Sequence, residues 1–439
     1  MMEGNVFQVS RVVQLFPRYL RSFEPSFFMQ DDWRATPKLT FNLGLRYDII
    51  TPDVDKGNHI SHFDPVSGTF RVAGQGASNT ADIRTDYKSI APRFGLAFNV
   101  LPKTVLRAGY GIVFFRDNTG PSVPFADPPY VGTYSPNVNT TTFSTPIPLP
   151  TQASTTNPSG ALRGMQLTYA NSYVHEFNAN VQQDIGFNTV LTVAYVGELG
   201  HALRTSPNVN LGPLGLSTAG AYTSRRPFLG KFPNVTDIFN IQSNGFSNYH
   251  SLQTSVVKQA GHGLTLQANY TWSHALGDVQ GFSQGGLYTS ADPANTGTVE
   301  YGNSELDVRD RFAMMLNYRI GLADALNGWK AVLAKGWQAN AIDVWETGQP
   351  FTVVNPSPRT NTGVGSDRPN QLRVPHVSTR TNAAWFDRVA FAPQPLGSLG
   401  TTARNSIYGP SFRHFDASLF KDFDLTERLS CSFGPRRSM

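Results

Sequence analysis

The sequence predicts an all-β fold, an antiparallel up-and-down meander of about 12 strands. Three observations carry this prediction. Aromatic residues make up 12% of the 439 residues, and 39 glycines and 30 prolines favour many turns over long helices. Apolar and polar residues alternate with period two in one segment after another. Short turns alternate with connections of about 30 to 60 residues, so every long connection of a meander falls at the same end.

The clearest strand is 38–48, where apolar side chains occupy every second position and charged or small polar residues lie between them. The apolar positions are Leu39, Phe41, Leu43, Leu45 and Tyr47. Full charges on the polar face suit a strand with lipid on one side and water on the other. The preceding run, 26–35, ends at Thr36 and Pro37, and a proline there presets a tight turn. These two runs therefore predict a hairpin.

Five further pairs of runs follow. They are 89–100 with 104–115, 173–182 with 189–198, 248–259 with 264–275, 311–320 with 337–346, and 412–423 with a short run from Leu429. Within the fifth connection, 323–336 predicts one or two helical turns. The cleanest apolar stripe contains Leu264, Leu266, Ala268, Tyr270 and Trp272. We expect these stripes to face outward, and we expect the opposite, inward face to carry Arg46, Arg107, Asn178, Asn180 and Gln267.

Composition and charge exclude several classes of protein. No stretch of eighteen apolar residues occurs, so no transmembrane helix is predicted. The net charge is +5, but lysines and arginines are scattered singly, which argues against nucleic acid as a partner. The single cysteine, Cys431, excludes an internal disulfide framework. The first residues lack the basic segment, apolar core and cleavage site of a signal peptide.

Motifs that could carry catalysis have simpler interpretations. Residues 281–285 fit G-x-S-x-G, but the following stretch cannot form the helix that a nucleophile elbow requires. The nine histidines never take the spacing of a zinc-binding helix. Asp31 and Asp32, and the aspartates of 307–311, lie beside predicted strands, where lumen-facing charges pair with neighbours. We therefore predict no enzyme, no cofactor and no metal site.

Most tyrosines and tryptophans lie near predicted strand ends, where aromatic rings favour the two membrane interfaces. A few lie in the long connections instead and are freer to contact a ligand. These candidate ligand-binding residues are Tyr130, Tyr134, Phe228 and Trp385.

The stretch QDDWRATPKLTFNLGLRYD, at 30–48, resembles a barrel segment of TonB-dependent outer-membrane transporters, particularly the Oar-like subgroup. Other phrases extend the resemblance in order along the chain, namely APRFGLAFNV, LRAGYGIVF, FNANVQQDIG, LTVAYVG, YHSLQTSV, LQANYTWSHAL, DVRDRF and GQPF. The resemblance implies a receptor that imports a bulky nutrient across the outer membrane, with membrane lipid, a plug domain and a TonB-type energy-coupling protein as partners.

On this interpretation, residues 1–25 are a loop or the remnant of a preceding strand, 26–433 are part of the C-terminal barrel, and 434–439 are an atypical tail. The plug domain and signal peptide are expected to be absent from this chain. Twelve strands are about half of the 22 in plugged transporters, so we expect an open, curved half-barrel. Two alternatives stay open: a complete small passive porin, and a soluble β-rich binding or adhesion protein of the cell surface.

Overall fold

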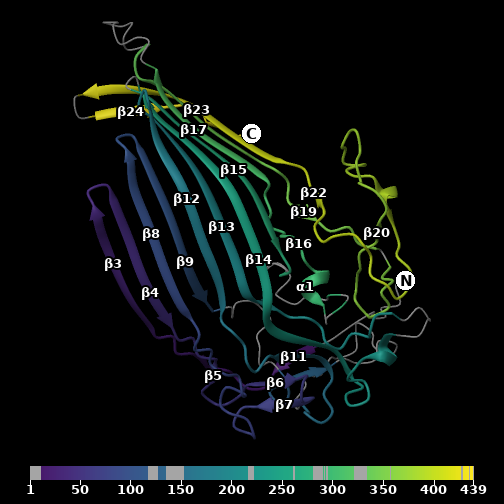
Figure 1. Cartoon of the computed structure of the whole chain (residues 1–439). Coiled ribbons are helices and arrows are strands. Elements are labelled where there is room, and N and C mark those ends of the chain that lie inside the picture. The colour runs from purple at the N-terminus through teal and green to yellow at the C-terminus, as the bar shows by residue number, and fades with distance from the viewer. Residues whose placement is uncertain are drawn as a thin grey trace.

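A computed structural model of the chain describes all residues except 1–10, 117–126, 135–152, 216–221, 261–262, 280–289, 291, 293–294, 321–333, 356, 427–428, 435 and 439. Figure 1 shows one large, curved sheet with irregular segments gathered at one end. Within the described residues, no helix is long and apolar enough to cross a membrane.

The sheet is an antiparallel meander in which each of twelve described strands pairs with the next along the chain. The strands are β3 (Ser26–Thr36), β4 (Leu39–Asp48), β8 (Ile90–Leu101), β9 (Thr104–Phe115), β12 (Ser172–Gly186), β13 (Thr189–Thr205), β14 (Val235–Ala260), β15 (Leu264–Gly277), β17 (Asp310–Ile320), β18 (Trp337–Glu346), β23 (Phe412–Thr426) and β24 (Leu429–Phe433). The path runs from β3 to β24 without joining its ends, so the sheet is open in the described part of the chain. The predicted fold class is confirmed.

Cross-strand register places the predicted apolar stripes on one face. Leu43 lies opposite Phe94, Phe94 opposite Tyr110, and Tyr110 opposite Phe177. Directly opposed residues share a face of an antiparallel sheet, so these side chains form a continuous apolar surface. Leu43 is 42% exposed and Trp272 is 56% exposed, as expected for side chains that meet lipid. The polar residues alternate onto the other face.

The polar face is joined by hydrogen bonds between strands. Arg107 donates to Gln182 Oε1 at 2.7 Å, and Asn42 donates to Asp32 Oδ1 at 2.5 Å. The predicted inward residue Arg107 therefore lies on the side of the sheet where polar groups satisfy one another. This arrangement suits a water-facing lumen.

The short connections lie at the end of the sheet opposite the long ones (Figure 1). Between β12 and β13, Phe187 and Asn188 both have a φ of 53°. Two consecutive positive values define the turn whose twist matches a hairpin. The Phe187 side chain at this turn is 89% exposed.

Strands β13 and β14 are longer than the sequence suggested, because they continue beyond the membrane-facing sheet. Before Asn248, β14 extends back to Val235 and pairs in parallel with β11 (Gly160–Met165). Buried residues occur on both faces of this added part, and its apolar residues do not follow period two. Ile238 and Ile241 are 0% and 2% exposed.

The remaining elements belong to the connections. Paired short strands are β1 (Arg11–Gln14) with β10 (Val131–Tyr134), β2 (Leu20–Arg21) with β5 (Val54–Asp55), β6 (Ser61–Asp64) with β7 (Thr69–Val72), β19 (Pro350–Phe351) with β22 (Ile407–Tyr408), and β20 (Asn370–Gln371) with β21 (Phe391–Ala392). Two more join the large sheet, β16 (Gly302–Asn303) to β15 and β25 (Arg436–Ser438) to β23. Short helical turns are η2 (Tyr222–Arg225), α1 (Thr296–Val299) and η4 (Arg388–Ala390).

Three parts of the sequence interpretation concern the connections and the chain ends. Residues 1–25 contribute β1 and β2, which pair with segments of later connections, and the tail contributes β25. The G-x-S-x-G stretch at 281–285 lies outside the described residues. The predicted helical turns at 323–336 lie almost wholly outside them.

Candidate functional site

The long connections fold together rather than spreading into solvent. Residues 49–89, 127–134, 153–171 and 206–241, where described, form what we call the loop assembly, which contains β5, β6, β7 and β11 (Figure 1). Fully buried apolar side chains of the chain lie here, including Ile60, Phe63, Leu162, Val235 and Ile238. The loop assembly therefore has a core of its own at one end of the sheet.

Phe63 on β6 is the centre of that core. Its ring lies 5.4 Å from Phe70, 5.2 Å from Phe228 and 5.7 Å from Phe232, all in edge-on arrangements. Such aromatic pairs add to the stabilisation from burial. Phe228, a predicted ligand-contacting residue, therefore packs against the core of the loop assembly.

Asp127 joins three segments inside the loop assembly. Its carboxylate accepts hydrogen bonds from the Phe63 and Arg163 backbone amides, each at 2.9 Å, and its backbone carbonyl accepts from the Ser61 hydroxyl at 2.7 Å. The residue is 0% exposed. Burial raises the pKa of Asp127 to about 7, although the two backbone amides oppose the shift. This carboxyl group therefore titrates near neutral pH.

His62, the neighbour of Phe63, is also fully buried. Its Nε2 lies 2.9 Å from the Ala81 carbonyl oxygen, and its Nδ1 lies 3.3 Å from the Met165 backbone amide. The carbonyl requires a proton on Nε2 and the amide requires a lone pair on Nδ1, so the ring is neutral. Burial lowers the pKa of His62, which agrees with this assignment.

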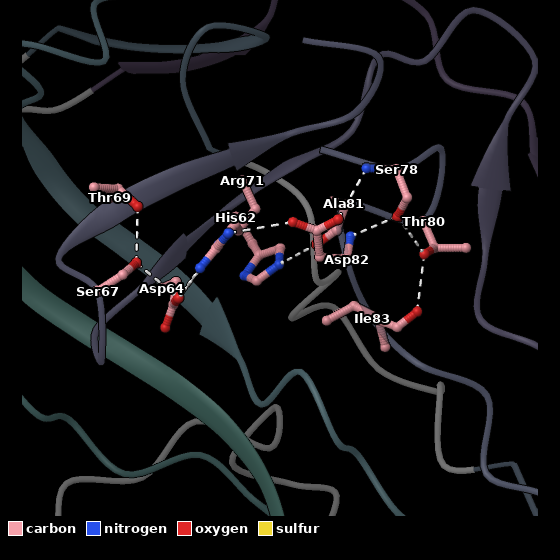
Figure 2. Close-up of polar contacts among 10 residues, drawn as sticks. All are labelled: His62, Asp64, Ser67, Thr69, Arg71, Ser78, Thr80, Ala81, Asp82 and Ile83. Atoms are coloured by element: carbon pink, nitrogen blue, oxygen red, sulfur yellow. Dashed lines mark hydrogen bonds and ion pairs between the residues drawn. The ribbon is translucent and has the colours of Figure 1, made fainter. Parts of the chain in front are cut away.

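An ion-pair network fixes the hairpin β6–β7, as Figure 2 shows. Arg71 donates to Asp64 Oδ2 through Nη2 at 2.8 Å and Nε at 3.2 Å, and reaches Asp82 through Nη1 at 3.3 Å. Burial alone would raise the pKa of Asp64, but hydrogen bonds from Arg71, Ser67 and the Val66 amide lower it below its usual value. The guanidinium is therefore committed to two carboxylates.

Beside this hairpin lies a groove with a volume of about 620 Å³. The β6–β7 hairpin, including Asp64, Ser67 and Arg71, supplies one side, and β14 and the segment after β11 supply the other. Polar residues facing the groove from that side include Gln166, Thr168, Asn240, Gln242 and Asn244. This volume falls within the range of about 300 to 1,000 Å³ that small-molecule sites occupy. We call this cavity the amide groove.

A second cavity, of about 70 Å³, lies where the loop assembly meets β9 and β12. Arg116 lines it and donates to Glu24 Oε1 at 2.5 Å and to Asp53 Oδ1 at 2.6 Å. Burial raises the pKa of Asp53, while the charge of Arg116 works in the opposite direction. The small volume and the paired arginine make this a structural junction.

The other predicted ligand-contacting residues lie in separate places. Tyr130 is 6% exposed, and its ring lies 5.9 Å from Phe16 and 5.4 Å from His59. Tyr134 ends β10. Trp385 lies in the connection after β18, where its Nε1 donates to the Tyr408 carbonyl at 2.6 Å. None of the four predicted residues lines the amide groove as described.

The outward face of the sheet carries a regular set of tyrosines. The Tyr110 hydroxyl lies 2.8 Å from His175 Nδ1, the Tyr195 hydroxyl lies 2.7 Å from His250 Nδ1, and the Tyr270 hydroxyl donates to Asp310 Oδ1 at 2.6 Å. Each tyrosine stands six residues after the first residue of its strand. Amphipathic rings at a common height are typical of a membrane interface.

An open antiparallel meander with a lipid-facing apolar surface, aromatic rings at one height and its long connections at one end defines an outer-membrane β-barrel protein. The comparison with known families agrees. The chain belongs to the family described as outer membrane beta barrel domain, which it matches over residues 1–434. Its location is accordingly the outer membrane.

Solved structures of outer-membrane transporters and receptors are similar to the chain. The transporter YddB from Escherichia coli has 11% sequence identity and a TM-score of 0.47, with 94% of this chain and 40% of that chain covered. The alcaligin receptor FauA from Bordetella pertussis has 10% identity and a TM-score of 0.40, with 95% and 43% covered. The chain thus spans about 40% of the length of these proteins. No curated protein matches it.

Proposed function

We propose that the chain is part of the barrel of a TonB-dependent outer-membrane receptor that imports a bulky nutrient, and that it has no enzymatic activity. The observation that carries this proposal is the open twelve-strand meander whose long connections fold into a packed assembly containing the amide groove. A passive porin needs an open channel, whereas a receptor needs a shaped ligand site at the outer end of its barrel.

The resemblance of 30–48 and the later phrases to TonB-dependent transporters supports the same function. Twelve strands are too few to surround a plug, so the chain would act together with further strands, a plug domain and a TonB-type protein. The two open edges agree, because backbone groups at a sheet edge in lipid require partners.

Deleting the coding sequence in the source bacterium tests the function. We expect slower growth on complex nutrients, and the same defect in a strain that lacks its TonB-type protein. A deletion that slows growth further in a strain already lacking the TonB-type protein would contradict energy-coupled import.

A second experiment separates the receptor from the small porin. The 439 residues are fused to an export signal and expressed in a Gram-negative host, and outer-membrane fractions are examined. A heat-modifiable, protease-resistant band would mean that these strands close by themselves, which would favour the porin. We expect aggregated protein instead, because both edges and the lipid-facing stripe would be exposed to water.

A further inference from the structure

The amide groove has carboxamide side chains at alternate positions of a single strand. Asn240, Gln242 and Asn244 of β14 all line it, and Gln166 lies beside them. Two residues along a strand advance about 6.6 to 6.8 Å. An extended peptide repeats its backbone amide groups at the same interval. The groove therefore matches such a peptide in spacing.

A carboxamide is also complementary to a peptide unit, because it carries both an acceptor and donors. Asn240 is 7% exposed, and its Oδ1 is buried without a hydrogen-bond partner. Buried polar groups in folded proteins are nearly always paired. That oxygen lies against Gly164 of β11, so Asn240 reaches a ligand by turning its carboxamide toward the groove, where the oxygen gains the partner that the described residues do not give it.

The neighbouring carboxamides differ in how far they are already used. Gln242 Oε1 accepts from Asn244 Nδ2 at 3.0 Å, whereas Gln242 Nε2 has no partner among the described residues. Asn244 Oδ1 accepts from the Thr205 hydroxyl. Asn244 thus orients Gln242, and Gln242 keeps its donor for a ligand.

The charge of the groove favours a neutral ligand. The charged side chains that line it are Asp64 and Arg71, which are paired with each other, and Arg71 also contacts Asp82. An anion would have to displace a carboxylate from Arg71. A cation would have to compete with Arg71 for Asp64.

The apolar part of the lining consists of Pro65, Val66, Met165 and Leu167. Val66 is 95% exposed at the hairpin tip. Apolar surface beside a row of carboxamides suits a peptide, whose side chains can contact the walls while its backbone pairs with the floor. A neutral sugar would more often be met by an aromatic ring, and no described residue lining the groove is aromatic.

We propose that the amide groove binds a short, neutral peptide in extended conformation, with Asn240 and Gln242 pairing to its backbone amide groups. The import of the bound peptide rests on the proposed function, whereas the binding itself does not. Binding itself is tested separately, on the purified chain.

The experiment titrates the full chain in detergent with a blocked pentapeptide, acetyl-Thr-Val-Ser-Val-Thr-amide, and measures heat of binding. We expect saturable binding that falls about tenfold in the Asn240→Leu variant, since one or two hydrogen bonds are lost. Gln242→Ala should weaken it similarly. The matched control, Asn178→Leu, removes a carboxamide from the inward face of β12 and should bind as the unchanged chain does.

A second ligand tests which chemical groups are recognised. The same pentapeptide with alternate backbone nitrogens methylated keeps its side chains but loses donors, so we expect about tenfold weaker binding. Equal binding of both peptides, or no binding of either, would overturn the proposal. Binding of maltotetraose that Asn240→Leu abolishes would assign the groove to an oligosaccharide instead.

Folding and function are controlled independently. Each variant must give the tryptic fragment pattern of the unchanged chain, and Gln242→Ala provides the test if Asn240→Leu does not. Peptide binding without a growth defect in the deletion strain would refute import and leave the binding site intact. A growth defect without peptide binding would do the reverse.

Discussion

The Asp343 carboxylate and the Arg413 guanidinium form a two-pronged ion pair between β18 and β23, with Nε to Oδ1 and Nη2 to Oδ2 both at 3.1 Å. Asp343 lies opposite Phe415 and Arg413 lies opposite Trp345, so both charges are on the lipid-facing side of the sheet. Lipid cannot hydrate a lone charge, and the pairing is therefore what makes both residues tolerable there.

Removing one partner of that ion pair should destabilise the sheet more than removing both partners. In a complete barrel that contains this chain, we expect Arg413→Leu to lower the urea midpoint in lipid vesicles, because Asp343 is left without its partner. The double variant Asp343→Leu and Arg413→Leu should recover most of the loss. Tryptophan fluorescence measures the midpoint, and strictly additive effects would show that the two charges are independent.

The two faces of β4 should respond differently to the same charge. Leu43→Arg puts a cation on the lipid-facing side and should cost about 2 to 4 kcal/mol near mid-bilayer in a complete barrel. Asn42→Arg should cost little, because the new side chain faces Asp32 on the polar side. Urea unfolding in vesicles compares the two, and equal costs would argue against a lipid-facing stripe.

The loop assembly should weaken as pH rises toward neutrality. The folded pKa of Asp127 is about 7, above its ordinary value of 3.8, so the folded state holds the proton more tightly. The stabilisation that this raised pKa contributes is fully present below about pH 4. It is lost as pH rises through 7, at up to about 1.4 kcal/mol per pH unit. Hydrogen exchange of β6 and β11, corrected for intrinsic rates, measures it.

Asp127→Asn is the control for that pH dependence, since an amide keeps an acceptor for Phe63 and cannot ionise. The variant should lose the decline above pH 4. Burial of His62 has the opposite sign, because its lowered pKa destabilises the fold as pH falls below 6.5. An unchanged pH profile in Asp127→Asn would show that this carboxyl group is not responsible.

Gly164 is predicted to be intolerant of any side chain. A Cβ there would lie 2.7 Å from both the Phe63 carbonyl oxygen and Asn240 Oδ1. The carbonyl belongs to β6 and cannot move away cheaply, so Gly164→Ala should cost about 1 to 3 kcal/mol. A Cβ on Gly230 would have nothing within 4 Å, so Gly230→Ala should leave the stability unchanged. Limited proteolysis of the loop assembly distinguishes them.

The sheet was predictable because protein covers neither face of its strands. Lipid on one side and water on the other impose period two on each strand, as in 38–48, and short turns set the pairing. The extension of β14 escaped prediction for the opposite reason. In this stretch Val235 and Ile241 are buried on one face and Ile238 on the other, so the alternation is broken.

The amide groove was harder to predict from the sequence. Asn240, Gln242 and Asn244 alternate in the sequence, but the hairpin that faces them lies about 170 residues earlier, and no local pattern joins the two. The prediction of aromatic residues such as Phe228 as ligand contacts rests on residue type alone. In the structure, Phe228 packs against the core of the loop assembly instead.

Strand β14 passes from the groove into the membrane-facing sheet as 26 continuous residues, roughly 85 Å measured along the chain at about 3.3 Å per residue, and it bends between the two (Figure 1). Its register against β13 shifts between Ser247 and Ser243, but on the groove floor Asn240 pairs with Gly164 of β11 and Gln242 with Thr205 of β13. Any movement that closes the groove over a bound ligand must therefore come from the β6–β7 hairpin.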